Sequence, residues 1–495
     1  MALQKRILSK LVLILSFFVY VTCCCILQAQ AMDRSVIIGF HKKTGSAEED
    51  LIHKHGGGMK RKFRHIAAYA ADLPDYELEK LRKNPNVKYI VEDMVYSVVE
   101  PVASVAADPL EYANSWGVER IGSMTAHVNA ITGKGVRIAV LDSGIDYTHQ
   151  EFSTSYSGGW DFVFNDDDPF DDSWNSHGTH VAGIIAAAAD GSGVVGVAPG
   201  AELYAIKVLD GGGFGLLSWI ISGIEWAIDN DMDVVNISIG GPHIEALQDA
   251  CDAAYNAGVL LVAAAGNGTT VGYPAAYDSV IAVTGTDNLD QPGWFAPTGS
   301  LVELAAPGVA VYSSTADNSY TLLSGTSQAA PHVSGAAALL LSVGMDDVNG
   351  DGLVNNMDVR GRLQMSAQDL GDPGQDDVYG HGLIDVVAAL SVDSDIGFSF
   401  DLVREKKRRQ NREVLAIEGG TYLFSIANHS LRGLKVVAYE DGYRRFDLDQ
   451  HFVFRPKTQE EASFSLDTDG TALDVMFLPI GRAESSATVT VNNIN

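Results

Sequence analysis

Cysteine is almost absent from this 495-residue chain, which contains only four. Three of them, Cys23, Cys24 and Cys25, lie close to the N-terminus, and Cys251 is the fourth. If the N-terminal segment is removed, one cysteine remains and no internal disulfide bond can form. An exported protein without disulfides needs another form of cross-linking, and bound metal ions are the obvious candidate.

Long apolar runs are equally scarce, because only the first 31 residues contain one. Lys5 and Arg6 give a basic start, residues 11–27 are apolar, and Ala29-Gln30-Ala31 offers small residues for cleavage. The pattern is typical of a signal peptide, although the length of the run leaves a retained membrane anchor as the alternative. No later stretch reaches about 18 uncharged apolar residues. We therefore expect a secreted, extracellular protein with no membrane association after signal removal.

Positively charged residues are also few. The chain has 34 Lys and Arg residues and 63 Asp and Glu residues, which gives a net charge of −29. The acidic excess lies in residues 101–394, which hold 6 basic and 37 acidic residues. A block of this sign repels nucleic acid and anionic membranes, so we expect no nucleic-acid partner. The charge favours cation binding, but an acidic surface for solubility or a salty habitat also explains much of it.

The chain is too long for one ordinary domain. After the signal peptide at 1–31, residues 32–100 predict a small α+β domain. Its expected elements are strands at Val36–Phe40 and Val87–Val91 and a helix at Tyr76–Lys83. Residues 101–110 (PVASVAADPL) are Ala-rich and typical of an exposed linker.

The rest of the chain changes pattern twice. In residues 111–394, short runs that are apolar on both faces alternate with helical segments, which indicates an α/β fold with a parallel sheet covered on both sides. In residues 395–495 the helical segments end, and alternating β-branched and aromatic residues predict a β-sandwich-like C-terminal domain.

Three short motifs of the α/β block carry candidate catalytic side chains. Asp142 in VLDSGID ends a buried strand, where a carboxylate points into the ligand crevice of an open α/β sheet. His177 in NSHGTHVAG begins a helix of small residues. Ser327 in SGTSQAAPHVSGAAALLL precedes a long helix whose N-terminus favours negative charge. Each alone could be an ordinary cap or helix start, but together they supply a nucleophile, a base and an orienting carboxylate.

The motifs and their order resemble the subtilisin-like serine proteases from about Val36 to Leu390. The resemblance implies a serine endopeptidase that cuts protein and peptide substrates with Asp142, His177 and Ser327 as its catalytic triad. It also implies that Asn267 in VLLVAAAGN forms the oxyanion hole with the backbone N–H of Ser327.

The same resemblance implies a substrate cleft. The residues that it assigns are Ser238, Ile239, Gly240 and Gly241 along the primary pocket, Gly213, Phe214 and Gly215 on the opposite rim, and Gly272 at the pocket base. An extended substrate would pair with these segments as a β-strand. The glycines leave space for a large apolar or aromatic residue before the scissile bond, with broad specificity otherwise. Two residues depart from the family, because Gln328 replaces the usual methionine after the nucleophile and Leu217 replaces an aromatic on one subsite wall.

The N-terminal domain resembles the inhibitory prodomain of the family, through IIGF, GGGMKRKFRHIAAYAADLP and LRKNPNVKYIVED. The resemblance implies that this prodomain assists folding, inhibits the enzyme and is then cut off by it. The junction is expected near Val99–Glu100, or later in the Ala-rich linker.

Calcium is the predicted cofactor, and three stretches could bind it. The segment DVNGDGLVNNMD has EF-hand spacing with Asp in the last position, and its candidate ligands are Asp347, Asn349, Asp351, Leu353, Asn355 and Asp358. A second set, implied by the resemblance, comprises Glu151, Asp190 and the carbonyls of Ala188, Ser192 and Val194. The third, in DFVFNDDDPFDD, comprises Asp161, Asp166 and Asp168. An ordinary polar loop is the alternative for the first and third stretches.

Other classes of function remain open from sequence alone. One is a catalytically inactive subtilisin fold used for binding, which the presence of all four catalytic side chains disfavours. Another is a non-degradative processing protease of narrow specificity, and a third is an adhesive protein whose main role lies in residues 395–495. We expect the protein to be a monomer.

Overall fold

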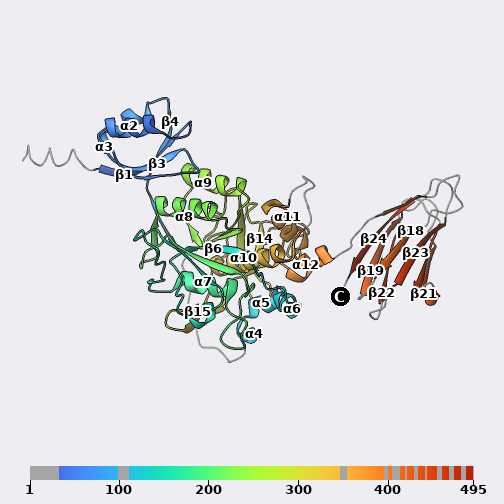
Figure 1. The fold of residues 1–495 in the computed structure, drawn as a ribbon. Coiled ribbons are helices and arrows are strands. Elements are labelled where there is room, and N and C mark those ends of the chain that lie inside the picture. Colours follow the sequence, from blue (N-terminus) through green and yellow to red (C-terminus); the bar gives the residue numbers. More distant parts are fainter. Residues whose placement is uncertain are drawn as a thin grey trace, which may run out of the picture. The chain divides into compact units, whose positions relative to one another are not determined.

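The computed structural model describes residues 33–98, 111–345 and 354–394, together with the strands β17 to β24 of a C-terminal region. The predicted signal peptide, the linker at 101–110 and the loop positions Asp347, Asn349, Asp351 and Leu353 lie outside the described residues. The chain divides into two compact units, Met1–Val386 and Val387–Asn495, and each is considered by itself (Figure 1).

Residues 33–98 form a small α+β domain with an antiparallel sheet in the order β2-β3-β1-β4. Its elements are β1 (Asp33–Phe40), α2 (Ser46–Lys54), β2 (Gly58–Lys62), β3 (Ala68–Pro74), α3 (Asp75–Arg82), β4 (Val87–Glu92) and β5 (Val95–Val98). Ile38, Ile52, Tyr69 and Leu81 are fully buried in a core of their own between sheet and helices. The two strands and the helix that the sequence predicted here are confirmed.

A seven-stranded parallel sheet dominates the next part of the chain, in the order β14-β13-β12-β10-β6-β8-β7. The strands are β6 (Arg137–Asp142), β7 (Tyr156–Asp161), β8 (Glu202–Lys207), β10 (Val234–Ile237), β12 (Leu260–Ala264), β13 (Val280–Thr286) and β14 (Leu304–Pro307). The central strands β6, β10 and β12 are buried almost throughout, as the two-faced apolar runs predicted.

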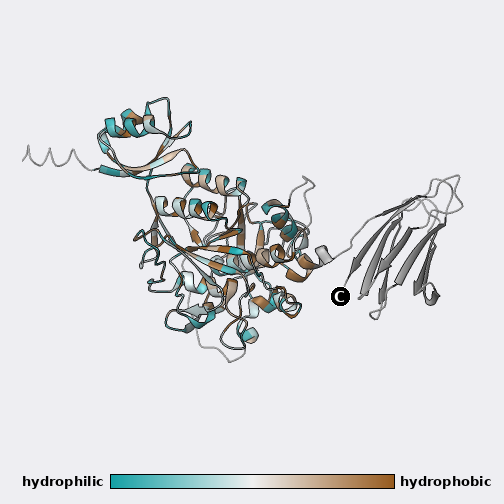
Figure 2. Cartoon of the chain, viewed as in Figure 1, coloured by the Kyte–Doolittle hydropathy of each residue, from teal (hydrophilic) through white to brown (hydrophobic). Residues whose placement is uncertain are grey.

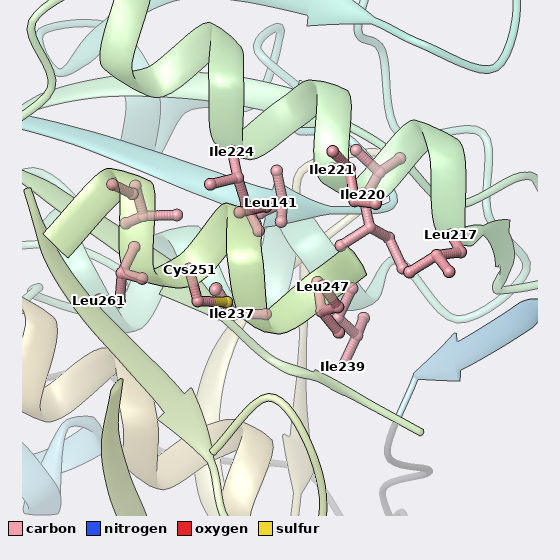
Figure 3. Close-up of a cluster of buried hydrophobic side chains, with 14 of the residues drawn as sticks. Leu141, Leu217, Ile220, Ile221, Ile224, Ile237, Ile239, Leu247, Cys251 and Leu261 are labelled. Atoms are coloured by element: carbon pink, nitrogen blue, oxygen red, sulfur yellow. The ribbon is translucent and has the colours of Figure 1, made fainter. Parts of the chain in front are cut away.

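Helices cover both faces of this sheet. Helices α8 (Leu217–Asp229) and α9 (Glu245–Asn256) lie on one side, and α7 (His177–Ala186) and α10 (Thr326–Val343) lie on the other (Figure 1). Figure 3 shows the apolar cluster under α8 and α9, to which both helices and Leu141 of β6 contribute side chains. The small residues of α7 and α10 let these two helices pack closely, and both are almost entirely buried.

Shorter elements surround the sheet. They are α4 (Glu111–Asn114), α5 (Trp116–Arg120), α6 (Ser123–Val128), η1 (Gln150–Phe152), β9 (Phe214–Leu216), β11 (Ile239–Gly240), β15 (Val311–Thr315), β16 (Ser319–Leu323), α11 (Asn356–Ser366) and α12 (Val386–Ser394). Figure 2 shows that the strands of the sheet and α10 are mainly hydrophobic, whereas α2 carries much hydrophilic surface. This contrast follows from burial, since α10 lies inside the molecule and α2 on its surface.

The C-terminal region contains two antiparallel sheets of four strands, in the orders β17-β24-β19-β22 and β18-β23-β20-β21. The strands are β17 (Phe400–Val403), β18 (Glu413–Ile417), β19 (Thr421–Asn428), β20 (Gly433–Glu440), β21 (Tyr443–Val453), β22 (Glu460–Asp467), β23 (Leu473–Ile480) and β24 (Ser486–Asn493). The predicted change from α/β to all-β structure is present, and the β-sandwich remains the interpretation of these two sheets.

Candidate active site

The three candidate catalytic residues lie at element ends on the carboxyl side of the parallel sheet. Asp142 is the last residue of β6, His177 is the first of α7, and Ser327 is the second of α10. All three are fully buried. His177 Nδ1 lies 2.8 Å from Asp142 Oδ1 and 3.0 Å from Oδ2. The geometry thus couples residues 35 positions apart into one carboxylate–imidazole pair.

The carboxylate of Asp142 makes the imidazole of His177 a stronger base. Burial lowers the pKa of His177, but the charge and the hydrogen bond of Asp142 outweigh it and leave the pKa raised. Because Nδ1 faces the carboxylate, Nε2 is the ring atom that can exchange a proton with a substrate or a nucleophile. Nε2 is buried and has no hydrogen-bond partner among the described residues.

A buried aspartate that the sequence analysis missed supports the pair. Asp171 accepts hydrogen bonds from Ser143 Oγ at 3.0 Å and from Thr179 N and Oγ1 at 3.0 and 2.6 Å. Ser143 in turn donates its backbone N–H to Asp142 Oδ1 at 2.7 Å and accepts from Gly178 N at 2.9 Å. Asp171 therefore connects the loop after β6 to the first turn of α7. No feature of the sequence distinguishes Asp171 from the acidic residues around it.

Asn267 is held beside the N-terminus of α10. Its Oδ1 accepts from the backbone N–H and the hydroxyl of Thr326 at 3.0 and 3.1 Å. An amide whose oxygen is engaged in this way directs its NH₂ group elsewhere. A Cβ at Gly325 would lie 3.0 Å from Asn267 Nδ2, so glycine lets the amide approach the helix start closely. The arrangement places a fixed donor next to Ser327.

Ser238 is bound to the nucleophile's own segment. Ser327 Oγ donates to the backbone oxygen of Ser238 at 3.2 Å, and Ser238 Oγ donates to the backbone oxygen of Ser327 at 3.0 Å. Asn236 Nδ2 donates to Ser238 Oγ at 3.0 Å, and Ser334 Oγ donates to Asn236 Oδ1 at 2.9 Å. The side chain of Ser238, which the sequence predicted to line the primary pocket, therefore connects the segment after β10 with α10 in this structure.

The predicted cleft rims flank a strand of the prodomain. β5 lies between β11 and β9 in a three-stranded antiparallel sheet. The rim residues Phe214 and Gly215 pair with Ser97 and Tyr96, and Gly213 O accepts from Val98 N at 3.2 Å.

The opposite rim is supplied by β11. Ile239 and Gly240 pair with Val98 and Ser97. Both segments that the sequence predicted to bind an extended chain therefore bind one here, and the bound chain is the protein's own.

Two further predicted residues lie beside these rims. Gly241 exchanges two backbone hydrogen bonds with Tyr273. A Cβ at Gly272 would meet the backbone oxygens of Ala265 and Gly241 at 3.9 Å, so a methyl group fits there in ordinary van der Waals contact. Gln328, in the place of the usual methionine, is fully buried, and its amide has no hydrogen-bond partner among the described residues.

Of the candidate calcium ligands, Glu151 has the most distinctive environment. It is 1% exposed, and its Oε1 accepts from Val194 N at 3.2 Å and from the hydroxyl of Tyr320. Its Oε2 is buried without a partner among the described residues. Burial raises the pKa of Glu151 to about 7, and the charges of Asp190 and Glu111 add to the rise. A buried carboxylate oxygen with no donor is the environment in which a cation is most favourable.

The other candidate ligands make local hydrogen bonds. Asp161 Oδ1 accepts from two backbone N–H groups of its own turn, Asp166 from Asp168 N, and Asp168 from the Tyr147 hydroxyl. Asp190 accepts from Ser192, while Ala188 N donates to Glu151 O at 3.0 Å. Asn355 and Asp358 form the capping box of α11. Within the described ranges, no group of three or more His, Cys, Asp or Glu side chains stands at metal-binding spacing.

An aspartate, a histidine and a serine at one edge of this sheet, with an asparagine beside the serine, define a serine hydrolase of the subtilisin fold. The chain belongs to the subtilase family of serine endopeptidases, because the family profile described as "Subtilase family" matches residues 133–382. The profile described as "Peptidase inhibitor I9" matches residues 28–98, so the N-terminal α+β domain is an inhibitor-type prodomain.

Curated relatives agree with this assignment. Subtilisin E of Bacillus subtilis (strain 168) is 42% identical over 371 residues, covering 72% of this chain and 90% of the relative. The minor extracellular protease Epr of the same strain is 35% identical over 432 residues, which are 85% of this chain and 64% of the relative. The thermostable alkaline protease of Halalkalibacterium halodurans is 40% identical over 342 residues, 68% of this chain and 85% of the relative. No helix among the described residues is long and apolar enough to cross a membrane.

Proposed function

We propose that this chain is a secreted endopeptidase of broad specificity that is made as a preproenzyme and removes its own prodomain. The position of β5 carries this proposal, because β5 pairs with both rims of the cleft. On one rim its partner is Ile239. The residue before Ile239 is Ser238, whose backbone oxygen accepts a hydrogen bond from Ser327 Oγ. A protease whose own chain lies in its cleft is arranged to cut that chain once and then be inhibited by it. The N-terminal basic and apolar segment and the extracellular relative Epr support secretion.

The geometry supports an acyl-enzyme mechanism. Ser327 Oγ attacks the scissile carbonyl while His177 Nε2 takes its proton, and Asp142 orients the ring and stabilises the imidazolium. Asn267 Nδ2 and the backbone N–H of Ser327 stabilise the negative charge that develops on the carbonyl oxygen. Loss of one such donor typically raises the barrier by about 2.7–4 kcal/mol, a figure established for a subtilisin. His177 then protonates the leaving amine, and water repeats the sequence to release the acid.

The prodomain is held on the catalytic part by buried and exposed polar contacts. The backbone N–H groups of Arg64 and His65 both donate to Glu225 Oε1 at 2.7 Å, and Asp229 pairs with both side chains at 2.8 and 2.9 Å. Lys88 pairs with Asp249 at 2.9 Å. Glu225 is only 7% exposed and burial raises its pKa, so its hydrogen bonds from the prodomain offset a real desolvation cost.

Replacing Glu225 by glutamine should therefore loosen the prodomain. Arg64 and His65 would donate to a neutral oxygen, and hydrogen bonds to charged groups are stronger than those to neutral groups. In full-length protein that also carries Ser327→Ala, we expect amide hydrogen exchange around residues 64–66 to accelerate roughly five- to tenfold. Exchange measured by mass spectrometry on the matching peptides tests this.

The matched control is Asp229→Asn in the same background. Asp229 pairs with the side chains of Arg64 and His65, which are 75% and 30% exposed, and exposed pairs contribute little, so we expect a change of roughly twofold or less. Equal exchange rates in the parent and in Glu225→Gln would show that the carboxylate does not hold the prodomain in place.

The primary pocket is proposed to accept large apolar or aromatic residues. None of the residues assigned to it carries a charged side chain, and at Gly272 a Cβ would meet only the backbone oxygens of Ala265 and Gly241, both at 3.9 Å. Peptides that differ only before the scissile bond should be cut roughly tenfold or more faster with Phe or Leu than with Lys or Glu. The assay is kcat/KM on such a set, with a serine-reactive sulfonyl fluoride as the control that must abolish all cleavage.

A pocket variant sharpens this test. A methyl group at Gly272 meets no atom closer than 3.9 Å, so Gly272→Ala is compatible with the fold but fills part of the pocket. We expect it to reduce the ratio between the Phe and Leu peptides. Preferential cleavage after Lys or Arg by the parent enzyme would overturn the assignment of specificity.

Calcium is the proposed structural ion. Glu151, with its unpartnered buried oxygen, would supply the carboxylate, and the carbonyls of Ala188, Ser192 and Val194 with Asp190 would complete the site. Glu111, which sequence analysis missed, accepts from Gly191 N at 2.6 Å and adds negative charge to the same loop. When bound, the ion supplies positive charge that stabilises this loop and takes no part in proton transfer. A site at 347–358 remains a proposal on sequence spacing alone.

The domain boundaries are proposed as the sequence indicated them, with the prodomain at 32–100, the catalytic domain at 111–394 and the C-terminal domain at 395–495. The division of contacts near Val386 lies close to the last of these boundaries. The prodomain has its own apolar core, and it shares a unit with the catalytic domain, whose strands β9 and β11 pair with β5.

A further inference from the structure

Lys207, the last residue of β8, is a buried lysine beside the catalytic carboxylate. It is 1% exposed, and it pairs with Asp142 in the register of the parallel sheet. Side chains of directly paired residues lie on the same face of a sheet. The preceding pair, Leu141 and Ile206, belongs to the apolar cluster under α8 and α9 (Figure 3). Asp142 and Lys207 therefore both point to the opposite face, which α7 contacts.

The ammonium group of Lys207 binds oxygens from three segments of the chain. It donates to the backbone oxygens of Ser143 and Leu209 at 2.7 and 2.8 Å, and to Asp172 Oδ1 at 2.8 Å. These bonds use all three of its donors. The carboxylate among the acceptors belongs to a half-exposed side chain, so the desolvation of the ammonium is only partly offset by an ion pair. An apolar side chain would fill this space at lower cost, so the charge itself calls for a functional explanation.

Two of the three acceptors lie on the backbone that holds Asp142. Ser143 donates its N–H to Asp142 Oδ1 at 2.7 Å. Leu209 donates its N–H to the backbone oxygen of Asp142 at 3.2 Å. Lys207 binds the carbonyl oxygen of each of these residues. The ammonium therefore restrains the backbone on which the position of the catalytic carboxylate depends.

The third acceptor lies on the loop that leads into α7. Asp172 directly follows Asp171, whose carboxylate accepts from the backbone N–H and the hydroxyl of Thr179 in the first turn of that helix. His177 begins the same turn. Lys207 therefore connects the backbone around the catalytic carboxylate with the loop before the catalytic imidazole.

We propose that Lys207 is a positioning residue for catalysis, because its ammonium fixes the backbone around Asp142 and the loop before His177 against each other. The inference rests on the proposed endopeptidase function and concerns the rate of the chemical step. None of the hydrogen bonds of Lys207 reaches β9 or β11, so substrate binding should not depend on it. Catalysis depends steeply on alignment, since a misplacement of about 1 Å can lower a rate roughly a hundredfold.

The main test is Lys207→Met, which keeps an unbranched side chain and removes the ammonium. The processed enzyme is assayed on a peptide with Phe before an anilide bond. We expect kcat to fall roughly ten- to hundredfold while KM changes less than about twofold. A purely structural role predicts a lower melting temperature, with kcat per folded molecule unchanged. Circular dichroism gives the folded fraction, to which the rates are normalised.

Asp172→Asn tests the connection to the loop without emptying the buried position. Asp172 is half-exposed, so its amide remains solvated and the variant is compatible with the fold. The amide accepts a weaker hydrogen bond from the ammonium, so we expect kcat to fall roughly two- to fivefold with KM unchanged. Asp167→Asn is the matched control, because it removes one exposed charge from the same acidic segment, and Asp167 makes no hydrogen bond or ion pair with Lys207. Its kcat should equal that of the parent.

The outcomes separate the role of Lys207 from the activity itself. A parent-like kcat in folded Lys207→Met would overturn the proposal, and so would a rise in KM that accounts for the whole loss. If Lys207→Met yields no folded enzyme, Asp172→Asn decides, and a kcat equal to that of Asp167→Asn overturns the proposal. If the parent enzyme leaves the anilide peptide and casein intact, the endopeptidase function is wrong and this inference fails with it.

Discussion

Replacement of Ser327 by alanine is expected to leave a folded, uncleaved protein with its prodomain still attached and with no protease activity. The variant removes the only atom that can form the acyl-enzyme, while the packing of α10 is unchanged because Ser327 is a small residue at the helix start. The expected loss in kcat is roughly 10⁶-fold, as known for removal of the serine or the histidine of a subtilisin triad. Casein hydrolysis measures the loss of protease activity, and the mass of the purified chain shows whether the prodomain is still attached.

His177→Ala is the matched control, because serine and histidine act as one unit. It should lose about as much activity as Ser327→Ala, and the double variant should lose little more. Casein hydrolysis by purified Ser327→Ala above a mock purification would refute the assignment of the nucleophile. Removal of the prodomain by Ser327→Ala alone would refute self-processing but leave the triad standing.

Chelation of calcium is expected to lower the melting temperature of the Ser327→Ala protein by about 5–10 °C. The catalytic region has a large negative charge and no disulfide, and Glu151 is buried with one oxygen unpartnered among the described residues. An ion that binds only the folded state stabilises it by about 2.7 kcal/mol at a hundredfold excess over its dissociation constant. Unfolding in EDTA and in millimolar calcium, followed by circular dichroism, gives the shift.

Two controls identify the source of the shift. Sodium chloride at matched ionic strength screens surface charge and should recover only part of the loss. Glu151→Gln should reduce the calcium-dependent part, because an amide is a weaker calcium ligand than a carboxylate. If the midpoint in EDTA equals that in calcium, the acidic groups are solvated surface and the calcium proposal must be withdrawn.

Much of the fold could be predicted from sequence because the strands of the large sheet are apolar on both faces. Runs such as those of β6 and β12 are stable only inside a covered parallel sheet, and this requirement is local. Asp142, His177 and Ser327 were also recognisable, because each stands at the end of an element within a motif of small residues. Their chemistry follows from residue type, and their order along the chain from the family that they resemble.

The layers of the fold, the candidate triad and the prodomain were predictable from the chain alone, since the pattern that indicates each lies within short stretches of residues. Three features became visible only in the folded protein: the acidic residue that supports the Asp142–His177 pair, the contacts of Ser238 and the position of Tyr96. Asp171 differs from the adjacent Asp172 in its burial and in its hydrogen bonds to Ser143 and Thr179, and Tyr96 meets Pro242 across 146 residues. Such contacts depend on how strands and helices pack, and no local pattern records them. The shape of the substrate pocket therefore depends on how distant segments pack, whereas the candidate reactive groups can be recognised in short sequence motifs.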